Sequence, residues 1–339
     1  MMESKIKVGL MAYGMSGKIF HAPFFHAHEG FELRAVTERT KNDAAKDYPK
    51  IHTYRDVEAL LADESLELIV VNTPNFTHYE FAKATLNAGK HVLIEKPFSV
   101  SKAEAEELFS LGFRKGLKVL AYQNRRFDSD FMTVEKVVKS GKLGKITEAH
   151  IRFDRYRNEI SLKGFKEKDV PGAGIFYDLG AHMIDQAIAL FGIPSEFDKT
   201  YGKYRPGTEV DDFAHAHLKY SNGLNVFLTT NMLVVKPQPA YTFYGSKGTL
   251  IKDRTDEQEN QLQAGMKPTD TGYGKEKDDS EGHLFTFDDK GALKDEPLPS
   301  ETGDYKLLFD EVYKAIRGDG NYFINQNDIL GQLSILEKR

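Results

Sequence analysis

The stretch Lys5–Phe20, KIKVGLMAYGMSGKIF, constrains the fold more than any other part of the chain. It begins with apolar residues at every second position (Ile6, Val8 and Leu10), and this period of two predicts a short β-strand. A glycine-bearing turn, Ala12–Gly17, follows at once, and an apolar helix pattern follows the turn. A strand, a tight turn and a helix start direct backbone N–H groups and the positive end of the helix dipole toward a phosphate.

The turn matches the pattern G-x-G-x-x-G of dinucleotide-binding proteins, with Ala12 in the first glycine position. The pattern alone also occurs in ordinary strand–helix turns, so the rest of the chain has to support the assignment. If the turn binds a diphosphate, the residues that contact it are Tyr13, Gly14, Met15, Ser16 and Gly17.

Strand and helix patterns alternate at short spacing through residue 123. The predicted strands after the first cover residues 31–37, 66–72, 90–94 and 117–122, and the predicted helices cover 18–28, 56–63, 78–88 and 101–114. This alternation predicts an α/β Rossmann domain, a doubly wound parallel sheet with helices on both faces. Ligands of such sheets bind beyond the carboxyl ends of the strands, where the sequence places Gly14, Glu38, Thr73, Lys96 and Gln123.

Glu38 and Arg39 follow the second predicted strand side by side. An acid about 20 residues past the glycine turn accepts hydrogen bonds from the adenosine ribose of NAD, whereas an arginine there suits the 2′-phosphate of NADP. The pair therefore leaves the choice between NAD and NADP open.

The second half of the chain has a different pattern. Predicted helices at 131–140 and 175–191 flank a long strand at 145–157 and a polar loop at 158–174. Strand-like runs then recur at 196–204, 213–220, 224–232, 240–244 and 249–252. Helices are predicted at 258–265 and 304–317, with a mobile loop at 266–282 between them. We expect an α+β domain with an antiparallel meander.

Composition excludes several classes of protein. The chain has 339 residues, room for two domains, and its formal net charge of −5 without a basic stripe argues against a nucleic-acid partner. It has no cysteine, so thiolate nucleophiles and disulfides are ruled out. The N-terminus has no signal-peptide pattern, and no apolar run is long enough for a membrane span. We expect a soluble cytoplasmic protein.

Asp178 and His182 lie four residues apart on a predicted helix and therefore share a face. A carboxylate beside an imidazole fixes the tautomer of the ring and supports its charged form, which suits a general acid/base near neutral pH. An isolated D-x-x-x-H pattern is more often a salt-linked structural histidine. The pair His215 and His217 has no evident third ligand, so no metal site is predicted.

Five motifs in register resemble the glucose–fructose oxidoreductase and inositol dehydrogenase (Gfo/Idh/MocA) family of NAD(P)-dependent enzymes. They are the glycine turn, Asn72-Thr73-Pro74 with His78, Glu95-Lys96-Pro97, Asn124-Arg125-Arg126-Phe127, and Asp178-x-x-x-His182-x-x-Asp185. Their order and spacing match along nearly the whole chain. The runs YQNRRFDSDF and YDLGAHMIDQ are most similar to the branch that holds NADP-dependent scyllo-inositol dehydrogenase.

The resemblance implies a Rossmann domain at 1–123 and a substrate-binding and oligomerisation domain at 124–339, whose large, mostly antiparallel open sheet often mediates subunit contacts. The resemblance allows the C-terminal helix to pack back on the first domain. Members of the family usually carry more residues after this point, and the sequence leaves open whether the C-terminus is truncated. The function implied is hydride transfer between NADP or NAD, with a preference for NADP, and a ring-hydroxyl carbon of a cyclic polyol or sugar, in a homo-oligomer.

The site residues follow from the resemblance and the chemistry together. His182 would act as the base, Asp178 would orient it, and Lys96 would support the oxyanion. Coenzyme contacts beyond the glycine turn are expected from Glu38, Arg39, Thr73, Pro74, His78, Glu95, Gln123 and Asn124. Substrate contacts are expected from Lys96, Tyr156, Arg157 and Asp185, while Arg126 is expected to be a structural ion-pair partner.

Two other functions remain open from the sequence. The same fold can use NAD transiently in a redox-neutral elimination or glycosidase reaction. A nicotinamide-binding domain can also serve a non-catalytic sensor. A sensor would be expected to lack Lys96, Asp178 and His182 and to carry a nucleic-acid module, and the sequence shows the opposite on both counts.

Overall fold

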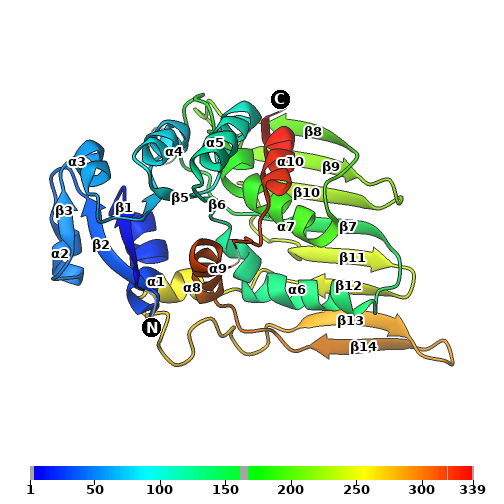
Figure 1. Cartoon of the computed structure of the whole chain (residues 1–339). Helices are drawn as coiled ribbons and strands as arrows, with labels where there is room; N and C mark the ends of the chain where they lie inside the picture. The colour runs from blue at the N-terminus through cyan, green and yellow to red at the C-terminus, as the bar shows by residue number, and fades with distance from the viewer. Residues whose placement is uncertain (1–3, 161–166, 319, 338–339) are drawn as a thin grey trace. The chain divides into compact units, whose positions relative to one another are not determined.

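The computed structural model describes residues 4–160, 167–318 and 320–337 (Figure 1). Contacts divide the chain into two compact units. Unit 1 comprises 1–124, 259–273 and 305–330, and unit 2 comprises 125–258, 274–304 and 331–339. We predicted two continuous domains, 1–123 and 124–339. In the structure the units interleave along the sequence, because two later segments pack with unit 1.

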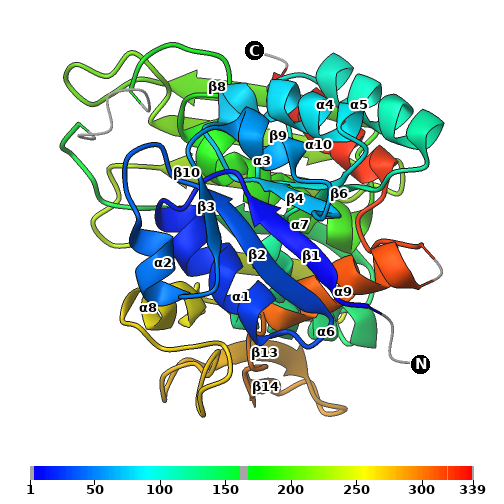
Figure 2. The ribbon, with the colours of Figure 1, turned by 60° about the vertical axis from the view of Figure 1, so that its left-hand side comes forward.

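Unit 1 is built on a six-stranded parallel sheet (Figure 2). Its strands are β1 (Ile6–Leu10), β2 (Phe31–Thr37), β3 (His52–Tyr54), β4 (Leu68–Val71), β5 (His91–Ile94) and β6 (Val119–Ala121). The spatial order is β3-β2-β1-β4-β5-β6. The order reverses between β1 and β4, and in sheets of this kind the ligand crevice opens at the carboxyl ends of the strands at that point.

The helices of unit 1 cover both faces of this sheet: α4 and α5 lie on one face, and α1 and α9 on the other (Figure 1). The helical segments are η1 (Gly17–His21), α1 (Ala22–Ala27), α2 (Asp43–Asp47), α3 (Val57–Ala62), η2 (Asn75–Thr77), α4 (His78–Asn87), α5 (Lys102–Lys115), α8 (Gln258–Gln263) and α9 (Lys306–Arg317). The segment η1 is a π-helix that continues directly into α1. The doubly wound α/β architecture predicted for this part of the chain is confirmed.

Local sequence signals explain where several of these helices begin. Ser101 accepts a hydrogen bond from the backbone N–H of Glu104 and caps α5, as the S-x-x-E pattern predicts. Asp56 caps α3 through the N–H of Ala59. Side-chain caps satisfy N–H groups that the first turn of a helix leaves without an internal partner.

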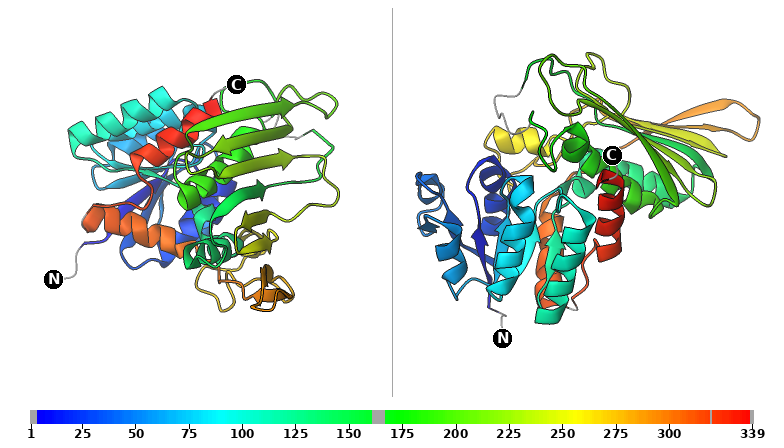
Figure 3. Two further views of the ribbon diagram at one scale, coloured as in Figure 1. Left: turned by 90° about the vertical axis from the view of Figure 1, so that its right-hand side faces the viewer. Right: turned by 90° about the horizontal axis from the view of Figure 1, so that it is seen from above.

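Unit 2 contains an eight-stranded, mostly antiparallel sheet. Its strands are β7 (Ile146–Arg152), β8 (Glu196–Gly202), β9 (Phe213–Lys219), β10 (Asn225–Asn231), β11 (Tyr241–Gly245), β12 (Gly248–Lys252), β13 (Gly282–Phe287) and β14 (Leu293–Leu298). Helices α6 (Ser129–Ser140) and α7 (Ala181–Phe191) pack on one face, and no described helix of unit 2 covers the other (Figure 3). The remaining helical segments are η3 (Asn124–Phe127), η5 (Phe176–Gly180) and α10 (Gln326–Glu337).

The mostly antiparallel open sheet predicted for the second half is confirmed, and the structure differs from the prediction in its details. The sheet is not a simple meander, because β7 inserts between β11 and β10 and pairs with β10 in parallel. Strands β13 and β14 lie where no strand was predicted. The segment 266–281 is a loop, as predicted, and Glu276 within it is buried and bonds to Lys252 and Ser129.

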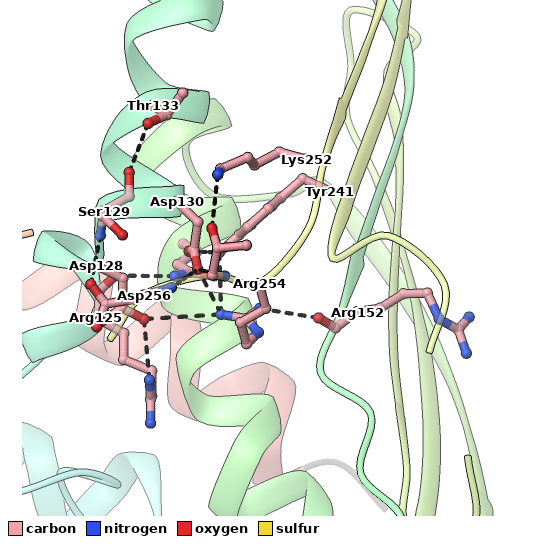
Figure 4. A network of polar contacts seen from close by, with 12 residues as sticks. Arg125, Asp128, Ser129, Asp130, Thr133, Arg152, Tyr241, Lys252, Arg254 and Asp256 are labelled. Carbon is pink, nitrogen blue, oxygen red and sulfur yellow. Dashed lines mark hydrogen bonds and ion pairs between the residues drawn. The ribbon is translucent and has the colours of Figure 1, made fainter. Parts of the chain in front are cut away.

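A buried polar network fixes the start of α6 in unit 2 (Figure 4). Asp130 accepts hydrogen bonds from the backbone N–H groups of Thr255 and Asp256, and the Asp256 carboxylate accepts one from the N–H of Ser129. Burial and the neighbouring Asp130 raise the pKa of Asp256 to about 6. The Asp256 carboxyl, close to Asp130, therefore keeps its proton to a higher pH than an ordinary aspartate.

Candidate active site

The glycine turn of unit 1 is closed by the side chain of Asn72, which follows β4. Asn72 Oδ1 accepts a hydrogen bond from the backbone N–H of Ala12 (3.0 Å), and Asn72 Nδ2 donates to the Ala12 carbonyl oxygen (2.8 Å). A Cβ atom at Gly17 would lie 2.2 Å from that oxygen, so only glycine fits there. Ala12 is not among the residues with positive φ, which explains why alanine is tolerated in place of the first glycine.

Glu95, at the carboxyl end of β5, connects the turn to the position of Lys96. Its Oε1 accepts hydrogen bonds from Ser16 Oγ (2.6 Å) and lies 2.8 Å from His21 Nε2, while Oε2 accepts one from the Lys96 N–H (3.1 Å). Burial would raise the pKa of the Glu95 carboxyl, but His21, Ser16 and the charge of Lys96 lower it to about 2. Glu95 is therefore ionised near neutral pH.

Glu38 is buried at the end of β2, and its carboxylate bonds to the backbone of the protein. Its two carboxylate oxygens accept hydrogen bonds from the backbone N–H groups of Asp43 (3.1 Å) and Ala44 (3.0 Å) at the start of α2. Arg39, the next residue, is exposed. Contact of Glu38 with an adenosine ribose stays a prediction, and its observed role is to hold the first turn of α2.

His78 begins α4 and joins the ends of two neighbouring strands. Its ring nitrogens lie 2.8 Å from the carbonyl oxygen of Pro97 and 2.9 Å from that of Thr73. The ring is fully buried, and burial lowers its pKa. Pro74 shapes the same loop, since its carbonyl accepts a hydrogen bond from the N–H of Thr77. His78 therefore links the backbone that follows β4 to the backbone that follows β5.

The other predicted coenzyme residues of unit 1 differ in exposure. The Tyr13 hydroxyl donates a hydrogen bond to Asp47 (2.8 Å), and burial raises its pKa, so Tyr13 remains neutral. Met15 is largely exposed, with 55% of its surface accessible. Gln123 and Asn124 are buried immediately after β6. Contact of these residues with a coenzyme stays a prediction.

In unit 2, Asp178 and His182 lie on one continuous helical path. Asp178 is half-buried in the π-helical segment η5, and His182 is buried in the first turn of α7. Their spacing of four residues places the side chains one turn apart on the same side. A π-helical turn is rare and frequently marks a functional site, which agrees with its position in this pair.

Asp211 fixes the start of η5, and the sequence analysis missed it. Its side-chain Oδ2 accepts a hydrogen bond from the N–H of Phe176 (2.8 Å), and its carbonyl accepts one from Ile175 (2.9 Å). Gly174 has a φ of +95°, and a Cβ there would lie 2.1 Å from Asp211 Oδ1. The only sequence signal was a pair of acids, Asp211 and Asp212, ahead of a strand.

Asp185 and Arg126 form a bidentate ion pair within unit 2. Arg126 Nε and one terminal guanidinium nitrogen each donate to the Asp185 carboxylate at 2.8 Å. The predicted ion-pairing role of Arg126 is confirmed. Tyr156 and Arg157 are exposed after β7. Substrate contact by Asp185, Tyr156 or Arg157 stays a prediction.

Arg205 is a second buried residue that no sequence pattern singled out, and its contacts are structural. It is buried and pairs with Glu167 (2.8 Å) and Asp212 (3.2 Å). These ion pairs tie the chain around residue 167 to the segment ahead of β9. The predicted loop 158–174 is described only in part, because residues 161–166 lie outside the described residues.

Two features are absent from the described part of the chain, a metal-binding cluster and a membrane-spanning helix. No group of three or more residues with suitable side chains could hold a metal ion there. His215 lies 3.0 Å from the Thr229 hydroxyl, and His217 lies 2.8 Å from Asn225 Oδ1. Within the same residues, no helix is both long and apolar enough to cross a bilayer.

Comparison with known families accounts for most of the chain. Residues 6–123 match the family model described as an oxidoreductase family with an NAD-binding Rossmann fold. Residues 131–251 match the model of the GFO/IDH/MocA C-terminal domain. The two matched regions include all the strands of the parallel sheet and the pair Asp178 and His182.

Individual relatives span nearly the full length of the chain. An oxidoreductase of Schizosaccharomyces pombe named C115.03 is 36% identical, covering 98% of this chain and 95% of its own. The scyllo-inositol 2-dehydrogenase (NADP(+)) IolW of Bacillus subtilis is 32% identical, covering 98% of this chain and 92% of its own. The crystal structure of an oxidoreductase from Bacillus cereus is 32% identical with a TM-score of 0.90, covering 98% and 95%.

Proposed function

This chain is a member of the GFO/IDH/MocA family of NAD(P)-binding oxidoreductases, and we propose that it moves a hydride between NADP and a ring-hydroxyl carbon of a cyclic polyol or sugar. The observation that carries the proposal is the pair Asp178 and His182 on the helical path η5–α7. The similarity to a scyllo-inositol dehydrogenase makes an inositol the first substrate to test. Its many hydroxyl groups suit the polar side chains predicted to contact substrate.

The glycine turn fits a dinucleotide. A Cβ at Gly17 would meet backbone, whereas a Cβ at Gly14 would meet nothing within 4 Å, so the turn is closed internally and open on its outer side. The absence of a side chain at Gly14 lets a diphosphate approach the backbone. When bound, the nicotinamide supplies the hydride chemistry, and the protein supplies binding, orientation and electrostatics.

The proposed roles of the reacting residues follow from their chemistry. His182 takes the proton of the substrate hydroxyl, and Asp178 orients the imidazole and stabilises its charged form. Lys96 provides positive charge to the oxygen that becomes an alkoxide as its carbon loses hydride. Asp185 is buried, and both of its carboxylate oxygens accept hydrogen bonds from Arg126, so its carboxylate is poorly available to a second substrate hydroxyl.

NADP is favoured over NAD because Glu38 is already engaged. Its carboxylate accepts two backbone hydrogen bonds from α2, so it is poorly available for a ribose. Arg39 is exposed beside it and suits a 2′-phosphate. Arg39→Ala should weaken NADPH binding roughly tenfold, as expected for one contact with a charged group, and leave NADH binding unchanged. Equal affinities for NADPH in the variant and the wild type would contradict this assignment.

We also propose a dimer or tetramer formed through the face of the eight-stranded sheet that no described helix of unit 2 covers (Figure 3). Tyr244, Phe287 and Leu293 are exposed apolar residues on strands β11, β13 and β14. Light scattering would give the mass of the assembly. A monomer at micromolar concentration would contradict the proposal. The predicted cytoplasmic location remains a proposal as well.

The experiment that tests the activity is reduction of NADP⁺ and NAD⁺, in parallel, by the purified protein with scyllo-inositol. Turnover with NADP⁺ supports the proposal, and other inositols and sugars then define the substrate. Tight coenzyme binding with no net reduction across that panel would favour the redox-neutral alternative. Failure to bind either coenzyme would contradict the proposal.

A further inference from the structure

The Glu95 carboxylate is a junction between three parts of unit 1. Ser16 belongs to the glycine turn, His21 ends the π-helical segment η1, and Lys96 follows β5. Side chains of the first two meet Glu95 Oε1, and the backbone N–H of Lys96 meets Oε2. One carboxylate therefore joins the proposed diphosphate-binding turn to the backbone of the proposed oxyanion residue.

Ser16 lies in the helical turn that leads into η1 and directs its side chain to the junction. Its hydroxyl donates to Glu95 at 2.6 Å and makes no side-chain cap. The backbone N–H of Lys18 in the same turn donates to the Gly14 carbonyl oxygen. Backbone N–H groups at the start of such a helix bind the phosphates of dinucleotides in Rossmann domains.

His21 has no exposure to solvent and is enclosed by aromatic rings. Its ring centroid lies 4.4 Å from that of Tyr122 and 6.4 Å from that of Phe309. Its Nε2 must carry a proton, because the Glu95 carboxylate opposite it can only accept. A buried carboxylate is unfavourable unless donors satisfy it, and His21 is a donor that cannot be replaced by bulk water there.

We propose that His21 is a positioning residue for the coenzyme: by holding Glu95, it fixes Ser16 in the glycine turn relative to the backbone of Lys96. The inference rests on the proposed function. The hydrogen bond to Glu95 gives a role to a histidine that is fully buried just after the glycine turn. Loss of the His21 donor would leave Glu95 with one side-chain donor and would loosen both the turn and the strand end.

The test compares His21→Gln, which retains an N–H donor near the position of Nε2, with His21→Phe, which retains the ring contacts alone. His28→Phe is the matched control, because it removes another histidine–carboxylate pair of unit 1, 3.0 Å from Asp310. NADPH binding is measured by fluorescence titration of the full chain. Turnover with scyllo-inositol is measured in parallel, and circular dichroism and thermal unfolding report the fold.

We expect His21→Phe to raise the Kd for NADPH roughly tenfold, the effect of losing one hydrogen bond to a charged group. His21→Gln should restore most of the affinity, and His28→Phe should bind as the wild type does. Wild-type affinity in His21→Phe would overturn the inference. Equal weakening in the Gln and Phe variants would show that ring packing, not the donor, is what matters.

The pH dependence gives a second readout, which a purely structural role would not change. The groups that face Glu95 are His21 with Ser16 on the side of η1, Lys96 beside it and His78 at the start of α4. In the wild type the low pKa of Glu95 makes its charge constant above pH 5, so it adds no pH dependence to binding. In His21→Phe the pKa of Glu95 rises, and its Kd should increase more steeply than that of the wild type as the pH falls from 8 to 5. Identical profiles in the two proteins would contradict the inference.

The possible failures can be told apart. If the wild type binds neither NADPH nor NADH, the proposed function fails before the inference is reached. If His21→Phe does not fold, Ser16→Ala decides, because it removes the other side-chain donor to the same oxygen without altering the aromatic packing. Wild-type affinity in Ser16→Ala would then overturn the inference.

Discussion

The two π-helical segments, η1 in unit 1 and η5 in unit 2, are built alike but braced differently. Each continues directly into an α-helix, and a carboxylate from elsewhere in its unit holds each one. In η1, Glu95 holds side chains, those of Ser16 and His21. In η5, Asp211 holds backbone N–H groups and leaves the side chain of Asp178 half-buried.

This difference suggests a division of labour. At η1 the carboxylate bonds to side chains, so the groups left to recognise a ligand are backbone N–H groups, which suit a phosphate. At η5 the carboxylate bonds to the backbone, so the side chains are left for proton transfer. We therefore expect changes at η1 to alter coenzyme binding and changes at η5 to alter turnover.

The largest effect is expected for His182→Ala. Loss of the general base should lower kcat roughly 10²–10⁴-fold. The Kd for NADPH should stay within about twofold, because Rossmann recognition of the coenzyme is supplied by unit 1. Stopped-flow turnover and fluorescence titration give the two values. Parallel loss of binding and turnover would contradict the division of labour.

A change within the glycine turn should produce the opposite result. Gly17→Ala places Cβ 2.2 Å from the Ala12 carbonyl oxygen, so the turn must shift. We expect the Kd for NADPH to rise tenfold or more, about 1.4 kcal/mol, together with a lower Tm. Gly14→Ala is the matched control: its Cβ meets no protein atom within 4 Å, so Tm should not change even though coenzyme binding weakens. A lower Tm in both variants would show that Gly14 also serves the fold.

The bracing of η5 can be tested by Gly174→Ala. The new Cβ would lie 2.1 Å from Asp211 Oδ1, at a φ of +95°. Strain and the clash together should lower stability by about 1–3 kcal/mol. They should lower kcat by a larger factor than they raise the Kd for NADPH. Gly223→Ala separates the two causes, since its φ is also positive but nothing lies within 4 Å of its Cβ. Equal destabilisation by both changes would mean that Asp211 makes no contribution.

The sequence predicted the parts of the fold that local patterns encode. The strand 31–37 matches β2 residue for residue, and Ser101 caps α5 as expected. The position of β7 between β11 and β10 depends on contacts between distant residues and has no local pattern. The run at 293–298 has three consecutive charged residues on an edge strand, so β14 lacked the apolar signal of a buried strand.

The same limit applies to the site. Glycines, strand ends and the spacing of Asp178 and His182 are visible in the sequence because their positions follow from short-range patterns. The sequence does not show that α2 bonds to Glu38 or that His21 bonds to Glu95. These contacts depend on which donors the fold brings near each carboxylate. Sequence patterns therefore find candidate groups more readily than their partners.

The smallest effect concerns the acid–base behaviour of buried carboxylates. Glu95 has a pKa of about 2 against 4.5, so its contribution to stability is present above pH 4.5 and is lost toward pH 2. Asp256 has a pKa raised from 3.8 to about 6, so its contribution favours folding in acid and is lost as the pH rises through 6.

Urea unfolding of Asp256→Asn and wild type between pH 4 and 7 checks this opposite sign. The stability of the variant relative to that of the wild type should rise with pH, because the amide does not ionise. It accepts the same hydrogen bond from the Ser129 N–H. A difference that does not vary with pH would contradict the assigned pKa.

An isotope label can follow the hydride that we propose to move from a ring carbon to the nicotinamide. The protein is incubated with NADP⁺ and scyllo-inositol deuterated at its ring carbons, and the NADPH formed is examined by mass spectrometry. We expect the NADPH to carry one deuterium on the nicotinamide ring. NADPH without the label would contradict direct transfer and with it the assignment of this chain as a polyol dehydrogenase.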